Sequence, residues 1–427
     1  MRILIEHGGY PVTNMGDLAM LQVAVERVKK SWDNVQIEVF SSAPDKLEKF
    51  CPNVYNLPSS SQQNWFHPLA KTHRLIPSSL SQHLSEFEWW FRHHSPSLSE
   101  SLIYLKLKAR RAETSHFESF IESFKKADLV VCSGGGYITD AFESKVNTTL
   151  GILSLAIKLG KPTVMFGQGL GPLKKTTLYT KAKAVLPHVN LIALREKRSS
   201  VPLLNSLGVS SNCFTVTGDD AIELAYAVRG SELGDGIGVN LRTADYANVS
   251  AESITTVKLV LQNIARDRSI PLIPIPIEFI EPHADTKAIQ QILEGYEIDS
   301  DGGQSLNTPL EVAKQASRCR VVVTGSYHAG VFALSQGVPI VGLAKSEYYK
   351  DKFLGLADQF GTGCEVVFLD DNQLQEKLTT AIEYALSSSE IIRPKLLEAA
   401  QQQIDLGHTA YQRMYELVTK VSTQTKS

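Results

Sequence analysis

The sequence predicts an α/β fold made of two doubly wound, Rossmann-like domains. Short apolar runs alternate with glycine-rich turns and helical patterns along most of the chain. Several runs are continuously apolar, as at residues 129–132, which is typical of parallel strands covered on both faces. These strand–helix units form two separate series, and 427 residues are enough for two large domains.

The first series occupies residues 1–226 and forms the predicted N-terminal domain. It opens with a strand at 2–6, followed by a loop with three glycines and then a helix. Asp17 is a candidate cap for this helix, whose apolar stripe starts at Leu18. The other predicted strands of the domain are residues 128–133, 162–166, 190–194 and 213–217.

The second series occupies residues 237–392, and the glycine-containing segment 225–236 is expected to connect the two domains. Residues 393–427 form a predicted helical tail with a polar end. Ligand sites of doubly wound domains lie at the carboxyl ends of the strands, so both sites should face the cleft. The predicted strands here are residues 237–241, 271–277, 320–323, 338–343 and 365–369.

Residues 58–101 do not follow this strand–helix rhythm. The segment is rich in serine and contains five of the eleven histidines together with Trp65, Trp89 and Trp90. A metal site is an alternative, but the only close pair, His93 and His94, would diverge on a helix. We therefore expect either a mobile loop or an insert that binds the acceptor.

Composition excludes several classes of function. The net charge of −2 argues against a general nucleic-acid binder, which needs a basic surplus to neutralise phosphates. None of the five cysteines is at CxxC spacing, so we expect reduced core residues in a cytosolic protein rather than a zinc site. The chain enters a strand pattern at once and has no apolar run of about 20 residues, so neither a signal peptide nor a membrane span is expected.

Three glycine-containing loops of the N-terminal domain could approach a ligand. Asn14 and Gly16 stand before a predicted helix, whose N-terminus offers free N–H groups, and Asp17 could accept a proton from a sugar hydroxyl. Residues 134–136 and 167–172 follow predicted strands and contain no P-loop or GxGxxG pattern, so ATPase and nicotinamide chemistry find no fingerprint here. The alternative is that these glycine segments only form tight turns and bind no ligand. The candidate binding residues in these loops are Gly135, Gln168 and Gly169.

Charged residues also follow strands in both domains. Arg195 and Arg242 each stand at the end of a buried strand, where a guanidinium is suited to bind carboxylate or phosphate, with surface ion pairing as the alternative. The loop 278–285 carries four ionisable groups, among them His283 and Asp285, and is either an acid–base site or a solvated loop.

The most informative segment is residues 321–334, where a strand runs into an apolar helix that His328 opens and Ser326 could cap. The positive end of the helix dipole disfavours a protonated imidazole, and a bound phosphate would favour it again. His328 is therefore a candidate general acid that an anionic substrate switches on, with a half-buried structural histidine as the alternative. Further local positive charge comes from Lys345, Lys350 and Lys352.

In this order, these motifs resemble the polysaccharide pyruvyl transferase family. The resemblance implies a GT-B-like pair of domains with a final helix that crosses back to the first. It also implies transfer of a pyruvyl group from phosphoenolpyruvate to a sugar of a cell-surface polysaccharide or of its lipid-linked precursor, forming a ketal. In that reaction His328 would be the acid and Asp17 or Asp285 the base. No cofactor or metal is needed, although Asp219 and Asp220 are a weaker candidate pair for magnesium.

One position departs from the family pattern. The family commonly has an arginine two residues before the histidine, where this chain has Ser326, and that arginine is expected to help hold the donor's anionic groups. Arg242, Lys345, Lys350 or Lys352 could compensate. One alternative is a GT-B glycosyltransferase with a nucleotide-sugar donor, in which Glu347 would be the candidate that binds the ribose, although its position suits this role poorly. The other alternative is a sugar-binding protein that catalyses no reaction.

The expected partners are a small donor and a glycan or lipid-linked acceptor, without nucleic acid. A lipid-linked acceptor would place a cytoplasmic enzyme at the inner face of the membrane. The sequence leaves the acceptor sugar, the linkage and the oligomeric state open.

Overall fold

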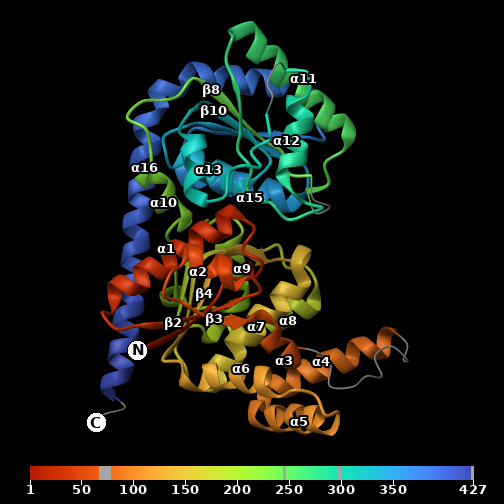
Figure 1. Ribbon diagram of the computed structural model, residues 1–427, viewed down its shortest axis with the longest axis vertical. Coiled ribbons are helices and arrows are strands. Elements are labelled where there is room, and N and C mark those ends of the chain that lie inside the picture. Colours follow the sequence, from red (N-terminus) through yellow and green to blue (C-terminus); the bar gives the residue numbers. More distant parts are fainter. Residues whose placement is uncertain (67–77, 244–246, 297–299, 425–427) are drawn as a thin grey trace.

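Two α/β domains stack on one another, with all strands parallel within each sheet (Figure 1). The computed structural model describes residues 1–66, 78–243, 247–296 and 300–424. The two doubly wound domains expected from the sequence are confirmed.

The N-terminal sheet has seven strands in the order β3-β2-β1-β4-β5-β6-β7. The central strands match the predicted ones closely, whereas β2 and β3 were not predicted. These two lie at one edge of the sheet and carry polar residues, so they lack a continuous apolar run. The strands are β1 (Arg2–Glu6), β2 (Gln36–Ser41), β3 (Tyr55–Pro58), β4 (Leu129–Ile138), β5 (Thr163–Leu170), β6 (Leu191–Leu194) and β7 (Phe214–Val216).

The C-terminal sheet has five strands in the order β12-β11-β10-β8-β9. In both sheets the chain order reverses beside the first strand, between β1 and β4 and between β8 and β10. Such reversals open a crevice at the carboxyl ends of the strands, and here the two crevices face each other. The strands are β8 (Gly236–Asn240), β9 (Leu272–Pro274), β10 (Cys319–Thr324), β11 (Ile340–Ala344) and β12 (Cys364–Phe368).

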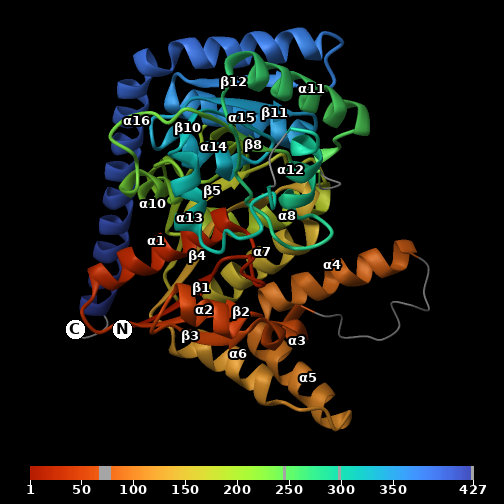
Figure 2. The ribbon, with the colours of Figure 1, turned by 45° about the horizontal axis from the view of Figure 1, so that its top comes forward.

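Helices cover both faces of the sheets (Figures 1 and 2). Those of the N-terminal domain are α1 (Met15–Ser31), α2 (Pro44–Phe50), α3 (Gln63–Phe66), α4 (Ser78–His94), α5 (Pro96–Ala109), α6 (Ser115–Lys126), α7 (Glu143–Lys158), α8 (Thr176–Val185), α9 (Ser200–Leu207) and α10 (Ala221–Ala227). Those that follow are α11 (Ala251–Arg268), α12 (Asp285–Leu293), α13 (Pro309–Ala316), α14 (Tyr327–Leu334), α15 (Glu347–Phe360) and α16 (Leu374–Gln424).

The cap of α1 differs from the prediction. The side chain of Asn14, not that of Asp17, accepts hydrogen bonds from the N–H groups of Gly16 and Asp17. Asn14 is therefore the residue that starts the helix. The carboxylate of Asp17, one turn further on, is not used by the cap.

The two later glycine segments were expected as loops at the ends of strands, with tight turns as the alternative, but β4 runs through residues 134–136 and β5 continues as far as Leu170. Gly134 and Gly167 have positive φ, and a Cβ on either would press on the side chain of Met20 in α1. Glycine is needed at these positions because α1 packs directly onto the sheet.

The segment 58–101 is not simply a loop. Within its described part, α4 and α5 form a pair of helices that projects from the N-terminal domain on the side away from the C-terminal domain (Figure 2). His93 bonds to Ser154 Oγ and His94 to the carbonyl of Trp90, so the two rings serve separate local contacts. Residues 67–77, which belong to the predicted insert, lie outside the described residues.

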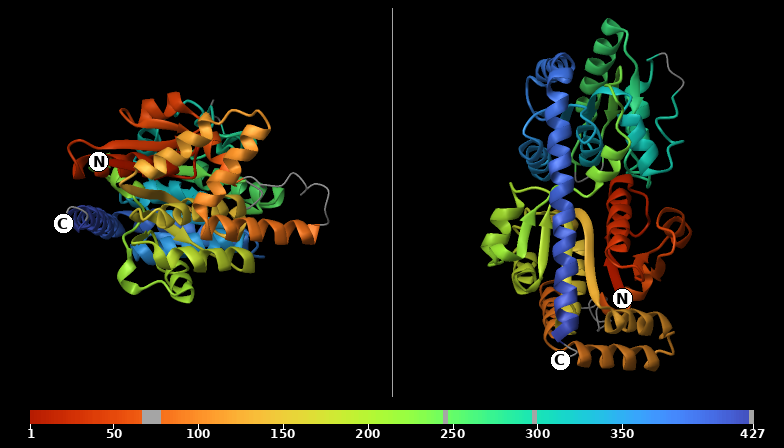
Figure 3. Two further views of the ribbon diagram at one scale, coloured as in Figure 1. Left: turned by 90° about the horizontal axis from the view of Figure 1, so that it is seen from below. Right: turned by 90° about the vertical axis from the view of Figure 1, so that its left-hand side faces the viewer.

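The predicted crossing of the final helix is confirmed. Helix α16 is 51 residues long and runs along both domains (Figure 3). Its second half packs into the N-terminal core through Ala410, Tyr411 and Met414. The face of Tyr411 stacks on Phe166 of β5, with the ring centroids 3.8 Å apart.

A buried ion-pair network joins α1, α10 and α16. Arg27 Nη1 lies 2.9 Å from Asp220 Oδ1, and its Nη2 lies 2.6 Å from Glu223 Oε2. Tyr411 Oη donates to the other oxygen of Asp220 at 2.9 Å. Removing the cation alone would leave buried carboxylates without compensation.

We predict that Arg27→Met lowers the free energy of unfolding by about 3–5 kcal/mol, because it breaks this buried network on one side only. Urea unfolding followed by circular dichroism measures the change. Arg268→Met is the matched control: Arg268 pairs with Glu383 at the surface, and its loss should cost at most about 1 kcal/mol. Equal losses in the two variants would contradict the assignment.

Candidate active site

A cavity of about 210 Å³ lies between the domains, at the carboxyl ends of their central strands. Both domains line it, at the places where the chain order of each sheet reverses, which is where doubly wound domains bind ligands. The lining residues are Asn14, Asp17, Gly136, Tyr137, Phe142, Lys145, Arg195, Arg242, Glu278, Ser326, Tyr327, His328, Tyr348, Tyr349 and Lys352.

His328 is the second residue of α14 and is 6% exposed. Its imidazole packs against the first turn of α1, where a Cβ on Gly16 would overlap the ring. Nε2 lies 3.6 Å from Oδ2 of Asp219, a carboxylate of the other domain. The ring is therefore fixed by the N-terminal domain although it belongs to the C-terminal one.

Asp219 follows β7 and is buried. Its Oδ1 accepts the N–H of Ala221, and its Oδ2 lies 3.5 Å from Arg195 Nη1. Burial raises the pKa of Asp219, but the neighbouring His328 and the charge of Arg195 outweigh it and hold the pKa below its usual value. Asp219 is thus placed as a carboxylate that stabilises positive charge on His328.

Arg195 follows β6, and its guanidinium lies 4.1 Å from the centre of the Tyr327 ring. Glycines make room for it, since a Cβ on Gly136 or Gly169 would press on the guanidinium. Its Nε has no hydrogen-bond partner among the described residues. The alternative of a surface ion pair does not hold at this position, because Arg195 is only 2% exposed.

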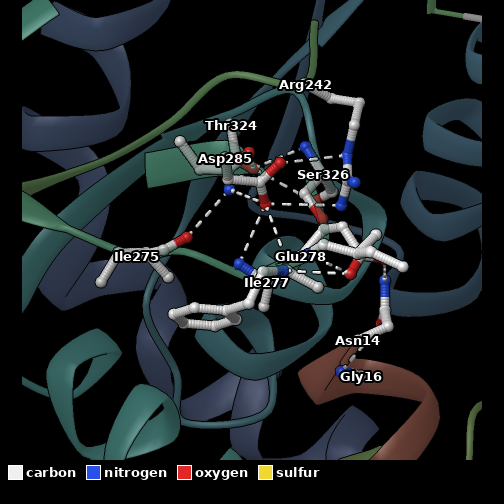
Figure 4. Close-up of polar contacts among 12 residues, drawn as sticks. Asn14, Gly16, Arg242, Ile275, Ile277, Glu278, Asp285, Thr324 and Ser326 are labelled. Carbon is white, nitrogen blue, oxygen red and sulfur yellow. Dashed lines mark hydrogen bonds and ion pairs between the residues drawn. The ribbon is translucent and has the colours of Figure 1, made fainter. Parts of the chain in front are cut away.

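Arg242 follows β8 and is held by Asp285 (Figure 4). Its Nε lies 3.2 Å from Asp285 Oδ1, and its Nη2 lies 3.4 Å from Oδ2. The same carboxylate accepts the Asn240 side-chain amide and the N–H of Ile277, each at 2.9 Å. Asp285 does not line the cavity, so the structure places it as a positioning residue for Arg242 and not as a base at the reacting atoms.

Strand pairing brings Arg242 beside Ser326. Thr324 of β10 pairs with Asn240 of β8, and each of the two site residues stands two positions further along its strand. Ser326 occupies the N-cap position of α14 but makes no side-chain cap, and its N–H donates to Thr324 Oγ1. A guanidinium therefore lies next to the position where the family commonly has its arginine.

Lys352 of α15 completes the cationic wall. Its Nζ lies 4.0 Å from the ring centre of Tyr348 and 5.4 Å from that of Tyr349. Burial, and then the positive charge of Arg195, hold the pKa of Lys352 well below its usual range. A negative charge in the cavity would raise the pKa of Lys352 back toward its usual range.

Contacts at the opposite wall cross the domain boundary. Asn14 Nδ2 donates to Glu278 Oε2 at 3.2 Å, and the N–H of Met15 donates to the carbonyl of Ile277 at 2.8 Å. Tyr348 Oη donates to the carbonyl of Gly136 at 2.6 Å. The cavity is therefore closed on several sides by direct hydrogen bonds between the two domains.

The lining carries four cationic side chains and two carboxylates, in addition to His328. This surplus favours an anionic ligand despite the negative net charge of the chain. Within the described ranges, no group of three or more His, Cys, Asp or Glu could hold a metal ion. Asp219 faces Arg195 while Asp220 faces Arg27, so this pair diverges.

The structure brings seven of the predicted site residues to the cavity, namely Asn14, Asp17, Arg195, Arg242, Ser326, His328 and Lys352. Gly16 and Gly169 lie behind them as packing positions. Gly135, Gln168, His283, Asp285, Lys345 and Lys350 do not line it.

The excluded residues have local roles. Gln168 is buried and donates to the carbonyls of Cys132 and Phe166. Gly135 sits against the ring of Tyr137. Lys350 pairs with Asp370 at 3.0 Å. Lys345 lines a different cavity, beside Asp370, and His283 lies in the partly exposed loop before α12.

Sequence reasoning missed Asp219 as the partner of His328 and did not single out Lys145, Glu278, Tyr327, Tyr348 or Tyr349. Helix periodicity could have found part of this set. In a helix that starts at Glu347, Tyr348 and Lys352 are four residues apart and share a face, whereas Lys350 points elsewhere.

Two more cavities continue the first along α7. One of about 380 Å³ shares Asp17 and Lys145 with the interdomain cavity and reaches Glu6 and Tyr10. Another of about 280 Å³ shares Ser144 and Thr148 with the second. Its walls include Trp65, Phe66, Trp89, Arg92 and Lys181.

Solved structures with this architecture support the GT-B assignment of the fold. A candidate UDP-N-acetylglucosamine 2-epimerase from Listeria monocytogenes superposes with a TM-score of 0.58 at 13% identity, covering 99% of this chain and 97% of that one. S. aureus MnaA in complex with UDP gives 0.56 at 14% identity, with 99% and 96% covered. Glycyrrhiza uralensis UGT73P12 gives 0.53 at 12% identity, with 100% and 97% covered. At these identities the likeness establishes the fold alone.

No curated protein matches the chain in sequence. The family model described as polysaccharide pyruvyl transferase matches residues 14–347, which include every residue that lines the interdomain cavity except Tyr348, Tyr349 and Lys352. The match therefore covers most of both domains and most of the candidate site. On this ground, the chain belongs to the polysaccharide pyruvyl transferase family, a family of transferases.

Proposed function

We propose that this protein transfers the pyruvyl group of phosphoenolpyruvate to a sugar of a cell-surface polysaccharide or its lipid-linked precursor, forming a ketal. The observation that carries the proposal is His328, held by Asp219 and Gly16 at the edge of a cavity with a surplus of cations. A small dianionic donor beside a protonatable imidazole fits this arrangement.

The donor's phosphate and carboxylate match the cationic wall. Arg195 and Arg242 can each bind an oxyanion through two N–H groups, and Lys352 supplies a third charge when the negative charge of the donor offsets the burial that lowers its pKa. The interdomain cavity, at about 210 Å³, is below the roughly 300–1,000 Å³ typical of pockets for drug-sized ligands, which favours a small metabolite over a nucleotide sugar.

The reaction follows from these positions. His328 gives a proton to the methylene carbon of the donor, and the neighbouring carbon becomes oxocarbenium-like. A sugar hydroxyl attacks this carbon and loses its proton to Asp17, the lining carboxylate on the acceptor side. The bond to phosphate then breaks, a second hydroxyl of the same sugar attacks, and loss of its proton completes the ketal. Inorganic phosphate leaves with one of the released protons.

The neighbouring cavity of about 380 Å³ is the proposed acceptor site, because it shares Asp17 with the donor cavity. Glu6 lies in its wall and accepts hydrogen bonds from the N–H of Gly8 and from Tyr10 Oη. Its Oε2 is buried without a partner among the described residues. Burial raises the pKa of Glu6 to about 7 against the effect of these hydrogen bonds, so near neutrality this group can donate to a sugar hydroxyl.

A nucleotide-sugar donor is the second candidate, favoured by Ser326 in place of the family's arginine. Two features weigh against it. Arg242 lies beside Ser326, and the ribose-clamp candidate Glu347 pairs instead with Lys174 of the other domain at 2.7 Å. We place the reaction in the cytoplasm with no cofactor besides the donor.

We expect phosphoenolpyruvate to raise the apparent Tm of the protein, because a ligand that binds only the folded state stabilises it by mass action. Differential scanning fluorimetry with phosphoenolpyruvate and, in parallel, UDP-N-acetylglucosamine and UDP-glucose measures the shift. Arg242→Gln should abolish most of the shift, whereas Lys350→Gln, a cation outside the cavity, should retain it. A shift with a UDP-sugar and none with phosphoenolpyruvate would establish the alternative donor.

We expect His328→Gln to lower kcat of pyruvyl transfer by about 10²- to 10⁴-fold while the thermal shift with phosphoenolpyruvate persists, because the variant loses the acid but keeps the cations. Asp219→Asn should also lower kcat, since the imidazolium loses the carboxylate that stabilises it. Product release measured as inorganic phosphate reports both. Normal turnover by His328→Gln would refute the acid assignment.

The raised pKa of Glu6 also makes the stability of the fold depend on pH. A carboxyl whose pKa is raised in the folded state binds more protons there than in the unfolded chain, so its contribution to stability falls as pH rises from about 4.5 to about 7. At pH 8, the free energy of unfolding of Glu6→Gln should therefore exceed that of the wild type by at most about 3 kcal/mol, and its melting temperature should be higher; at pH 4 the two proteins should be nearly alike. Thermal melts across this range test it, and a parallel offset at all pH values would contradict it.

A further inference from the structure

Exposed apolar side chains gather on one part of the surface. Among the described residues, twelve large hydrophobic side chains are exposed, and five of them lie on α4 and α5. These five are Phe87, Trp90, Leu98, Leu102 and Leu105, with exposed fractions between 47% and 62%. Large apolar groups gathered on two neighbouring helices of a folded protein mark an interaction surface.

Helix α5 has two apolar stripes, and only one of them is covered. Ile103 and Leu107 are four residues apart and pack into the domain. Leu98, Leu102 and Leu105 follow at spacings of four and three, so they share another face of the helix, which is exposed. A surface helix needs only one apolar stripe to pack on its domain, so packing within the domain does not explain the second, exposed stripe.

Helix α4, which contacts α5, also carries exposed aromatic side chains. Phe87 and Trp90 are about half exposed, and their rings stack with centroids 6.0 Å apart. Tryptophan combines a large apolar ring with an N–H donor, which suits the boundary between lipid and water.

Basic residues surround the exposed stripe of α5. Lys106 and Lys108 stand on either side of it on the helix, and Arg110 and Arg111 follow directly at its end. The carboxylate within α5, Glu100, pairs with Lys125 at 2.8 Å. The chain as a whole is slightly acidic, so this basic cluster is a local feature.

We propose that the α4–α5 pair docks on an anionic lipid bilayer, with the stripe of Leu98, Leu102 and Leu105 in the interface. An apolar stripe with lysines on both flanks is the pattern of helices that lie in a membrane interface, where long side chains reach the headgroups. The basic cluster would repel a second copy of itself but attracts anionic headgroups. The pair lies at the end of the N-terminal domain that is far from the C-terminal domain, so nothing in that domain blocks the approach (Figures 1 and 3).

The described part of the chain holds no helix with the length and hydropathy of a membrane-spanning segment. The proposal concerns docking in the plane of the interface.

Co-sedimentation of the full chain with vesicles tests the proposal. Vesicles of equal parts phosphatidylglycerol and phosphatidylethanolamine should bind the protein, and phosphatidylcholine vesicles should bind it at least about fivefold less, since they lack the anionic attraction. The triple variant Leu98→Glu, Leu102→Glu, Leu105→Glu should lose binding to both. Replacing Lys108, Arg110 and Arg111 by Gln should reduce binding to the anionic vesicles alone.

A matched control separates the stripe from added charge. Leu259, Leu310 and Leu406 are exposed to a similar extent on other helices, and their triple change to Glu adds the same charge. This control should bind anionic vesicles like the wild type, and circular dichroism verifies that both variants are folded. The proposal is overturned if the wild type does not sediment, if the control loses binding equally, or if the wild type is a dimer that the α5 variant dissociates without any vesicle binding. None of these readouts depends on the donor or on turnover.

Discussion

The arrangement of the candidate active site depends on the contact between the first turns of α1 and α14. The imidazole of His328 fills the space that a side chain at Gly16 would take, so the helices approach each other until the ring touches backbone. This contact crosses the domain boundary, as does the approach of Asp219 to the ring. Neither domain could therefore orient the histidine alone, and the site exists only when the two sheets face each other in this register.

Burial governs the electrostatics around this contact. Arg195, Arg242 and Asp219 are almost completely buried, and each charge is held by a specific partner. Water would weaken such pairs, whereas the enclosed site keeps them strong and fixed in direction. The glycines beside Arg195 serve the same purpose, because they let the backbone of two strands close around the guanidinium.

The central strands and several site residues could be predicted from the sequence because both follow local rules. Continuous apolar runs indicate buried parallel strands, and Arg195, Arg242 and His328 stand directly after such runs. The edge strands β2 and β3 carry polar residues and give no such signal. Asp219 lies far from His328 in the chain, so only the docking of the domains brings them together, and the positioning role of Asp285 likewise depends on tertiary contacts.

Helix α16 spans both domains and contains Pro394 in its interior. Proline removes one hydrogen bond of the helix and bends it. The helix packs on the C-terminal domain before this point and for about one turn after it, and on the N-terminal core from Ala410 onward. Any change in the angle between the domains would therefore bend α16, and the turn at Pro394 already lacks one hydrogen bond. The two domains are thus joined along one side of the molecule by a single long helix, in addition to the connector before β8 (Figure 1).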